Sequence, residues 1–194
     1  MHQETKRKSL HLVAATIPVI LIYVPWQFAV WPLIAFALLN VAVDMFKNRF
    51  EFLGRIYGYF FAGILRDHEI NGRFTGATCF FSSLAIAYGG FVGLLGMPVQ
   101  FVAVIYTGFM LGDAAAALVG KNFGKRVLYS GKTLEGFGAM VVVSFAATFW
   151  IIPGKMHLVF FASLMLAAVE LFLKRLDDNF FAPLVVTLVF YAVL

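Results

Sequence analysis

The sequence has 194 residues, of which 62% are hydrophobic and only 13% are charged. Soluble domains usually contain about 25% charged residues, so this composition predicts a membrane protein. The single cysteine, Cys79, excludes an intrachain disulfide and a cysteine-based zinc site. The net charge of +5 does not indicate nucleic-acid binding, because the basic residues lie in short segments between apolar runs, where membrane topology explains them.

Apolar runs separated by proline- and glycine-containing turns predict an all-α, polytopic membrane protein. A hydrocarbon core of about 30 Å needs roughly 20 apolar residues per helix. Residues 47–73 alternate apolar and charged side chains, which predicts an amphipathic helix at the membrane interface. In all we expect a single integral membrane domain over residues 1–194 with about seven transmembrane helices, at 9–25, 28–46, 74–93, 97–119, 136–152, 157–174 and 180–194.

The charged residues follow this predicted topology. Every Lys and Arg except Lys155 falls on one side of the membrane. The positive-inside rule places that side in the cytosol, with the N-terminus inside and the C-terminus outside. All ten Asp and Glu fall on the same side, although the rule does not require this. We therefore expect a polar site at the cytosolic face.

The most informative segment covers residues 108–136. Its helix carries a small residue at every fourth position, a spacing typical of close helix packing. Packing does not account for Asp113, because an acid inside an apolar helix is costly and usually functional. A carboxylate followed by several cations is what Mg²⁺ and phosphate groups require together. The small residues are Gly108, Gly112, Ala116 and Gly120, and the cations are Lys121, Lys125, Arg126 and Lys132.

Three further segments carry polar residues on the same face. Lys6 to Lys8 fit a basic anchor to anionic lipid, but this does not explain His11 at the start of the first span. Residues 66–78 contain two acids and two arginines near a helix mouth, which fit either a solvated loop or a headgroup site. Glu170 lies about one turn inside the sixth span, which favours a role in the protein interior.

Taken in order, these segments resemble those of the CTP-dependent lipid kinases, a family that includes dolichol kinase, phytol kinase and CTP-dependent diacylglycerol kinase. Phosphatidate cytidylyltransferase is more distantly similar. The sequence 132–136, Lys-Thr-Leu-Glu-Gly, is closer to dolichol kinase than to the other kinases. The run of alanines at 114–117 departs from the family pattern, which often has a serine there. The resemblance covers nearly the whole chain and rests on Glu4 with Arg7-Lys8 and His11, Arg66 to Thr78, Gly112 to Gly136, and Glu170 with Asp178-Asn179 and Pro183.

The resemblance implies an enzyme that transfers the γ-phosphate of CTP to the hydroxyl of a membrane lipid alcohol, with polyprenol or dolichol as the first candidates. It implies that Asp113 and Asp178 bind Mg²⁺, that Glu69 or His11 is the base, and that Lys132 is also catalytic. The residues expected to bind the nucleotide are Gly112, Gly120, Lys121, Gly124, Lys125, Arg126, Lys132, Thr133, Glu135, Gly136 and Asn179. The residues expected to bind the lipid are Arg7, His11, Arg66, Glu69, Thr75 and Glu170.

Other functions stay open at this point. Diacylglycerol and phytol are alternative acceptors, and a cytidylyltransferase would instead make a CDP-lipid and release pyrophosphate. The non-enzymatic alternative is a small transporter, but a transport path should place polar groups near the midplane and on both sides. The sequence is compatible with a homo-oligomer.

Overall fold

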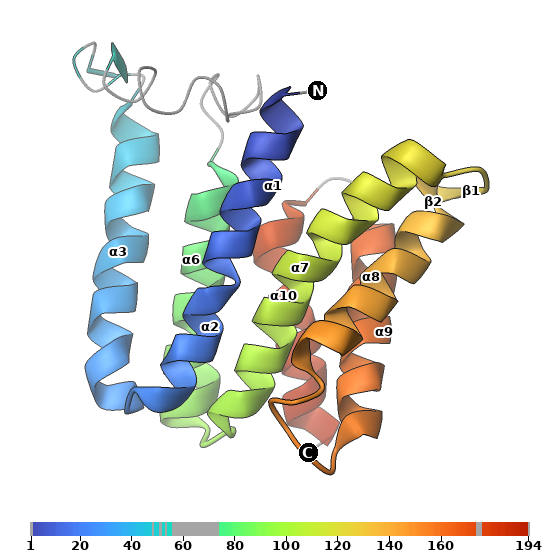
Figure 1. Ribbon diagram of the computed structural model, residues 1–194. Coiled ribbons are helices and arrows are strands. Elements are labelled where there is room, and N and C mark those ends of the chain that lie inside the picture. The colour runs from blue at the N-terminus through green and yellow to red at the C-terminus, as the bar shows by residue number, and fades with distance from the viewer. Residues whose placement is uncertain are drawn as a thin grey trace.

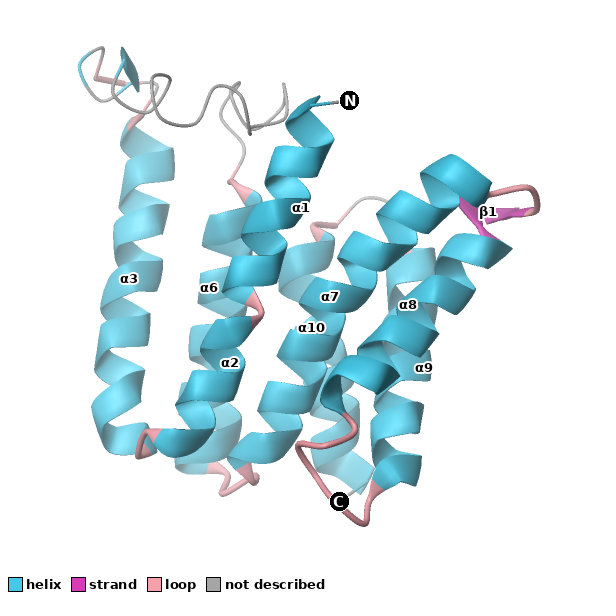
Figure 2. Ribbon diagram, in the orientation of Figure 1, coloured by secondary structure: helices cyan, strands magenta, loops and turns pink. Residues whose placement is uncertain are grey.

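The computed structural model describes residues 2–47, 49–50, 52, 54–55, 74–173 and 176–193, with the backbone alone for residues 2–7. Within these ranges the chain is almost entirely helical, with one small hairpin as the only sheet (Figures 1 and 2). The all-α prediction is therefore confirmed in its main point. The predicted interfacial helix over 47–73 falls largely outside the described residues.

Each of the seven predicted ranges contains helix. Three helical segments are long and apolar enough to cross a membrane, namely 26–46, 76–94 and 99–123, as expected of an integral membrane protein. The other apolar helices have 10–17 residues, so seven spans remain a prediction. The helices are α1 (His2–Ala14), α2 (Thr16–Ile20), the 3-10 helix η1 (Leu21–Tyr23), α3 (Trp26–Phe46), α6 (Gly76–Ile86), the π-helix η2 (Ala87–Leu94), α7 (Val99–Phe123), α8 (Leu134–Thr148), α9 (Met156–Phe172) and α10 (Asp178–Val193).

The predicted first span is broken at Ala15, between α1 and α2. Pro18 explains the break, because it has no backbone N–H to donate to the carbonyl group of Ala14. The hydroxyl of Thr107 in α7 donates to the carbonyl oxygen of Ala15 at 3.0 Å. The break is therefore held against the central helix.

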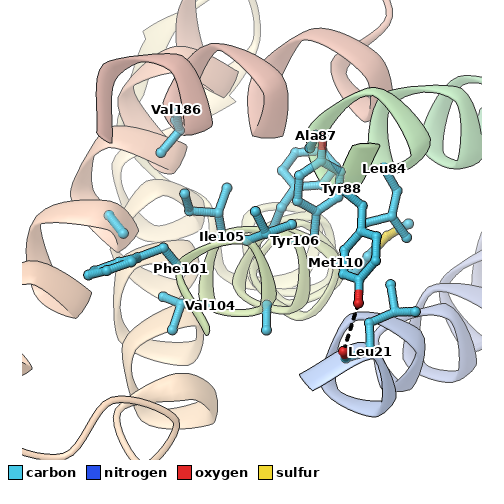
Figure 3. Close-up of a cluster of buried hydrophobic side chains, with 14 of the residues drawn as sticks. Leu21, Leu84, Ala87, Tyr88, Phe101, Val104, Ile105, Tyr106, Met110 and Val186 are labelled. Atoms are coloured by element: carbon cyan, nitrogen blue, oxygen red, sulfur yellow. Dashed lines mark hydrogen bonds between the residues drawn. The ribbon is translucent and has the colours of Figure 1, made fainter. Parts of the chain in front are cut away.

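Helix α7 is the centre of the bundle. Its residues are buried without interruption from Phe101 to Met110. Helices α1, α2, α8, α9 and α10 all contact it. Figure 3 shows part of this core, in which the hydroxyl of Tyr88 donates to the carbonyl oxygen of Leu21 at 3.0 Å. Because α7 also carries Asp113, the best-packed element of the fold positions that carboxylate.

The small residues of α7 pack against α8, as their spacing predicts. A Cβ added to Gly112 would lie 2.1 Å from Oγ of Ser144 and 3.0 Å from Cγ of Met140. Ser144 donates from the same Oγ to the carbonyl oxygen of Gly108 at 2.7 Å. Gly112 therefore serves the close approach of two helices directly beside Asp113.

A hairpin that the sequence analysis did not predict joins α7 to α8. Strand β1 (Val127–Tyr129) pairs antiparallel with β2 (Lys132–Thr133). Ser130 and Gly131 connect them with positive φ angles of 52° and 83°, as a two-residue type I′ turn requires. The hairpin brings Lys132 back to the end of α7.

The helices alternate so that their polar ends gather at one end of the bundle, at the top of Figure 1. The N-terminus of α1, the ends of α3, α7 and α9, and the starts of α6, α8 and α10 all lie there. Lys155 lies at the opposite end, between α8 and α9, with its Nζ 5.5 Å from the centre of the Phe101 ring. The predicted gathering of charged side chains at one end is thus found in the described part of the chain.

Candidate functional site

A cavity of about 380 Å³ lies at this charged end, where α1, α7, the hairpin and the nearby ends of α8, α9 and α10 meet. Its walls combine three carboxylates and three lysines with small and apolar residues. The lining residues are Lys8, Asp113, Ala116, Ala117, Gly120, Lys121, Gly131, Lys132, Thr133, Gly136, Phe137, Glu170, Leu171 and Asp178.

Asp113 forms the deeply buried part of the cavity wall, with 8% of its surface exposed. The ammonium of Lys8, from α1, forms an ion pair with its Oδ2 and lies 3.4 Å from its carbonyl oxygen. Nδ1 of His11, one turn further along α1, lies 3.1 Å from the same Oδ2. Helix α1 therefore supplies the counter-ion that a buried carboxylate requires.

Lys132 extends from the hairpin to Glu170 near the end of α9. Its ammonium forms an ion pair with Oε1 of Glu170 and donates to the carbonyl oxygen of the same residue. The Glu170 side chain is 13% exposed and that of Lys132 is 31% exposed. This second ion pair joins the connection between α7 and α8 to α9.

Three carboxylates converge in the cavity although they come from three different helices. Asp113, Glu170 and Asp178 each offer an oxygen, and these oxygens lie within 4.8 Å of one another. Carboxylate oxygens are the protein ligands that Mg²⁺ prefers. The sequence analysis assigned Asp113 and Asp178 to the metal and Glu170 to the lipid, whereas the structure groups all three.

Polar contacts at the start of α8 fix the hairpin. Oγ1 of Thr133 accepts a hydrogen bond from the backbone N–H of Gly136 at 3.2 Å and so caps the helix. The carboxylate of Glu135 accepts from the backbone N–H groups of Lys125 at 3.1 Å and Arg126 at 3.3 Å. Its own backbone N–H and these two hydrogen bonds lower the pKa of Glu135. Glu135 therefore acts on the backbone of the hairpin and does not line the cavity.

The site residues predicted from the sequence divide into three groups. In the cavity lie Asp113, Gly120, Lys121, Lys132, Thr133, Gly136, Glu170 and Asp178. Elsewhere in the described chain, Gly112 packs α7 against α8, and Gly124 lies against Thr133 of the hairpin. Lys125, Arg126 and Glu135 lie in the hairpin region. His11 lies beside Asp113, Asn179 is bonded to Asp177 and Asp178, and Thr75 lies beside Asp44. Outside the described residues lie Arg66, Glu69 and the side chain of Arg7.

Lys8 is the main cavity residue that the sequence analysis assigned elsewhere. The basic run at the N-terminus fits a lipid anchor, but Lys8 is only 4% exposed and is paired with Asp113. Its spacing from His11 does not single it out, because Arg7 and Lys8 precede His11 by four and three residues and both spacings place residues on one face of a helix. The packing of α1 against α7 therefore identifies Lys8.

A second buried acid, Asp44 of α3, lies at the same end of the bundle outside this cavity. Its Oδ1 accepts from Nζ of Lys47 at 2.9 Å. Its Oδ2 accepts from the backbone N–H of Thr75 at 2.7 Å and from the hydroxyls of Thr75 and Thr78 at 3.1 and 2.5 Å. Thr75 also caps the start of α6, so this cluster ties the end of α3 to α6.

Comparison with known proteins finds similarity to a bacterial protein. No family model matches the chain, and no solved structure matches it. The chain is similar to the uncharacterized protein RP860 of Rickettsia prowazekii (strain Madrid E), with 27% identity over 188 residues, which cover 93% of this chain and 90% of that protein. The similarity therefore extends over both the helical bundle and its charged end, and the name of the relative assigns no activity.

Proposed function

We propose that this chain is a membrane lipid kinase that transfers the γ-phosphate of CTP to the hydroxyl of a membrane lipid alcohol, with polyprenol or dolichol as the first candidates. The observation that carries the proposal is the cavity in which Asp113, Glu170 and Asp178 lie among three lysines. Phosphoryl transfer depends on positioning and charge neutralisation more than on covalent chemistry. The choice of CTP and of the lipid alcohol rests on the sequence resemblance.

The donor set of the cavity supports Mg²⁺ as the cofactor. Asp113 and Asp178, with Glu170 as a third oxygen donor, would hold the ion, which would neutralise charge on the phosphates when bound. Lys121 and Lys132, which line the same cavity, would contact the phosphate oxygens. Thr133 and Gly136 line the cavity at the start of α8, where the helix N-terminus also favours anions.

The proposed transfer forms one bond to the γ-phosphorus and breaks another. The lipid hydroxyl gives its proton to a base, and its oxygen forms a bond to the γ-phosphorus. The bond from that phosphorus to the β–γ bridging oxygen breaks, and CDP leaves. Glu69 and His11 are the two base candidates, and Nδ1 of His11 lies 3.1 Å from Oδ2 of Asp113. Glu69→Gln and His11→Gln, compared across a pH profile, identify which group accepts the proton.

One assay tests the proposal and separates it from CDP-lipid formation. Purified protein receives CTP or ATP labelled in the γ-phosphate, with Mg²⁺ and a panel of polyprenol, dolichol, phytol and diacylglycerol. A kinase gives γ-labelled lipid and CDP. A cytidylyltransferase gives pyrophosphate and carries an α-label into the lipid instead. Absence of transfer to every acceptor from either nucleotide, with folded protein and an active reference kinase in the same detergent, would contradict the proposal.

We also propose that the charged end of the bundle faces the cytosol, which the distribution of Lys and Arg supports. Lys125 is exposed in the hairpin region, and Lys155 is exposed at the opposite end. A single cysteine at position 125 should react with an impermeant thiol reagent only after the membrane is opened, and one at 155 should react in intact cells. The reverse pattern would invert the orientation. Cys79 is replaced by Ala in both variants to remove background labelling.

A further inference from the structure

We infer that Lys8 and Lys132 are built-in counter-ions of the cavity, and that they make the binding of a divalent cation and of a polyphosphate depend on each other. This inference rests on the proposed function and deepens it. Each lysine occupies a carboxylate that a metal would need, Lys8 at Asp113 and Lys132 at Glu170. The site therefore holds its own cations in the places where a metal would bind.

Burial makes these two ion pairs costly to break. The side chains of Lys8 and Asp113 are 5% and 11% exposed, and the side chain of Glu170 is 13% exposed. Removing the cation from a buried carboxylate, or the carboxylate from a buried ammonium, leaves a charge with too little solvation. A metal that binds Oδ2 of Asp113 must displace Lys8 and leave its ammonium without this anion.

A polyphosphate resolves this conflict. When phosphate oxygens arrive together with the metal, each lysine can exchange its carboxylate for a phosphate, and the carboxylates are left to the metal. A polyphosphate without metal instead meets three carboxylates whose oxygens lie within 4.8 Å of one another. Each ligand therefore binds weakly alone and strengthens the other, and this coupling is reciprocal by thermodynamic necessity.

The cavity contains its own matched control. Lys121 lines the same space but is exposed, and it forms no ion pair with a carboxylate among the residues that the structure describes. If lysines acted only through the general positive field of the cavity, all three would affect metal binding alike. If pairing is what matters, Lys8 and Lys132 differ from Lys121.

The test measures binding of Mn²⁺ alone, from the electron paramagnetic resonance signal of the free ion, in wild type and in Lys8→Met, Lys132→Met and Lys121→Met. Loss of a competing ammonium should tighten Mn²⁺ binding about tenfold or more in Lys8→Met and Lys132→Met. Lys121→Met should change it by less than about threefold. Lys132 is partly exposed, so Lys132→Met keeps the test informative if Lys8→Met fails to fold.

Binding of labelled CTP, measured by equilibrium dialysis with and without Mg²⁺, completes the test. Wild type should bind CTP at least tenfold more tightly with Mg²⁺, and all three lysine variants should weaken this binding. Unchanged or weaker Mn²⁺ binding in both Lys8→Met and Lys132→Met overturns the inference, even if the kinase assay succeeds. Tighter Mn²⁺ binding in those two variants supports it, even if another nucleotide proves to be the donor and the proposed use of CTP fails.

Discussion

The two buried acids at the charged end, Asp44 and Asp113, differ in how their carboxylate oxygens are used. Each lies on a long apolar helix, is less than a tenth exposed and is paired with a buried lysine. Asp44 accepts four hydrogen bonds, which use both of its carboxylate oxygens. The contacts of the Asp113 carboxylate with Lys8 and His11 both involve Oδ2, and two further carboxylates lie within reach.

The comparison shows that burial of an acid does not by itself indicate a functional site. An ionised carboxylate has about four acceptor positions, and the Asp44 cluster fills that number with donors from α3 and α6. Asp113 instead shares a cavity with two further carboxylates and three lysines. An acid whose acceptor positions are all filled stabilises the fold, whereas the proposed metal site rests on three acids grouped in one cavity.

The largest expected effect separates the two acids directly. Asp113→Asn should lower turnover in the kinase assay about a hundred- to a thousandfold, because it removes a proposed ligand of the Mg²⁺ that would neutralise transition-state charge. Asp44→Asn should retain most turnover per folded molecule but destabilise the protein by about 3–5 kcal/mol, because it breaks the buried ion pair between Asp44 and Lys47. Turnover is normalised to folded protein, and unfolding is followed thermally in detergent.

Two results with these variants would contradict the prediction. A large loss of turnover in folded Asp44→Asn would extend the site towards α3 and α6. Full activity in Asp113→Asn, with a large drop in thermal stability, would make Asp113 a second structural acid and remove the basis for the proposed metal site.

The second prediction compares two lysines of the α7–α8 connection. Lys132 lines the cavity and is paired with Glu170, whereas Lys125 contributes its backbone N–H to Glu135 and its side chain is exposed. Lys132→Ala should lower kcat about a hundredfold or more. Lys125→Ala should mainly raise the KM for the nucleotide a few-fold. Equal small losses at both positions would mean that these lysines serve topology alone.

The third prediction concerns Gly112, which packs α7 against α8 beside Asp113. Gly112→Ala would place a Cβ 2.1 Å from Oγ of Ser144, and the resulting overpacking should destabilise the protein by about 1–3 kcal/mol. Gly138→Ala on α8 is the control, since a Cβ there meets nothing within 4 Å. Ser144→Ala should partly restore Gly112→Ala in thermal unfolding. A loss of nucleotide affinity in Gly112→Ala without destabilisation would support the nucleotide-binding role predicted from the sequence.

The fold could be predicted from the sequence because apolar periodicity is a local signal. All seven predicted helical ranges contain helix, and the stripe of small residues correctly indicated close packing between α7 and a neighbour. The break at Ala15 was missed because its cause, Pro18, lies at the start of the second segment, where proline is also tolerated. The hairpin was missed because its strands have only three and two residues.

The site could be predicted only where a residue conflicted with its own surroundings. Asp113 and Glu170 are acids in apolar helices, so each was identified without knowledge of its partners. The partners themselves, Lys8 for Asp113 and Lys132 for Glu170, are 105 and 38 residues away in the sequence. Lys8 also lies in a basic run that membrane topology explains, so nothing local distinguished it. Helix packing, which the sequence does not encode locally, determines these pairs.

The smallest expected effect concerns Glu135, which supports the hairpin without lining the cavity. Its carboxylate accepts hydrogen bonds from the backbone N–H groups of Lys125 and Arg126, and these bonds lower its pKa. Glu135→Gln keeps the shape but removes the charge, so hydrogen exchange over residues 124–133 should become a few-fold faster.

Because a lowered pKa in the folded state stabilises the hairpin above the ordinary pKa of glutamate, wild type should lose this protection as the pH falls through the lowered pKa of Glu135. The Gln variant should show no such loss after correction for intrinsic exchange. Because Lys132 itself is kept, a looser hairpin should raise the KM for CTP a few-fold and leave kcat nearly unchanged. A large fall in kcat in Glu135→Gln would instead place this carboxylate among the groups that act on the phosphates, together with Asp113 and apart from Asp44.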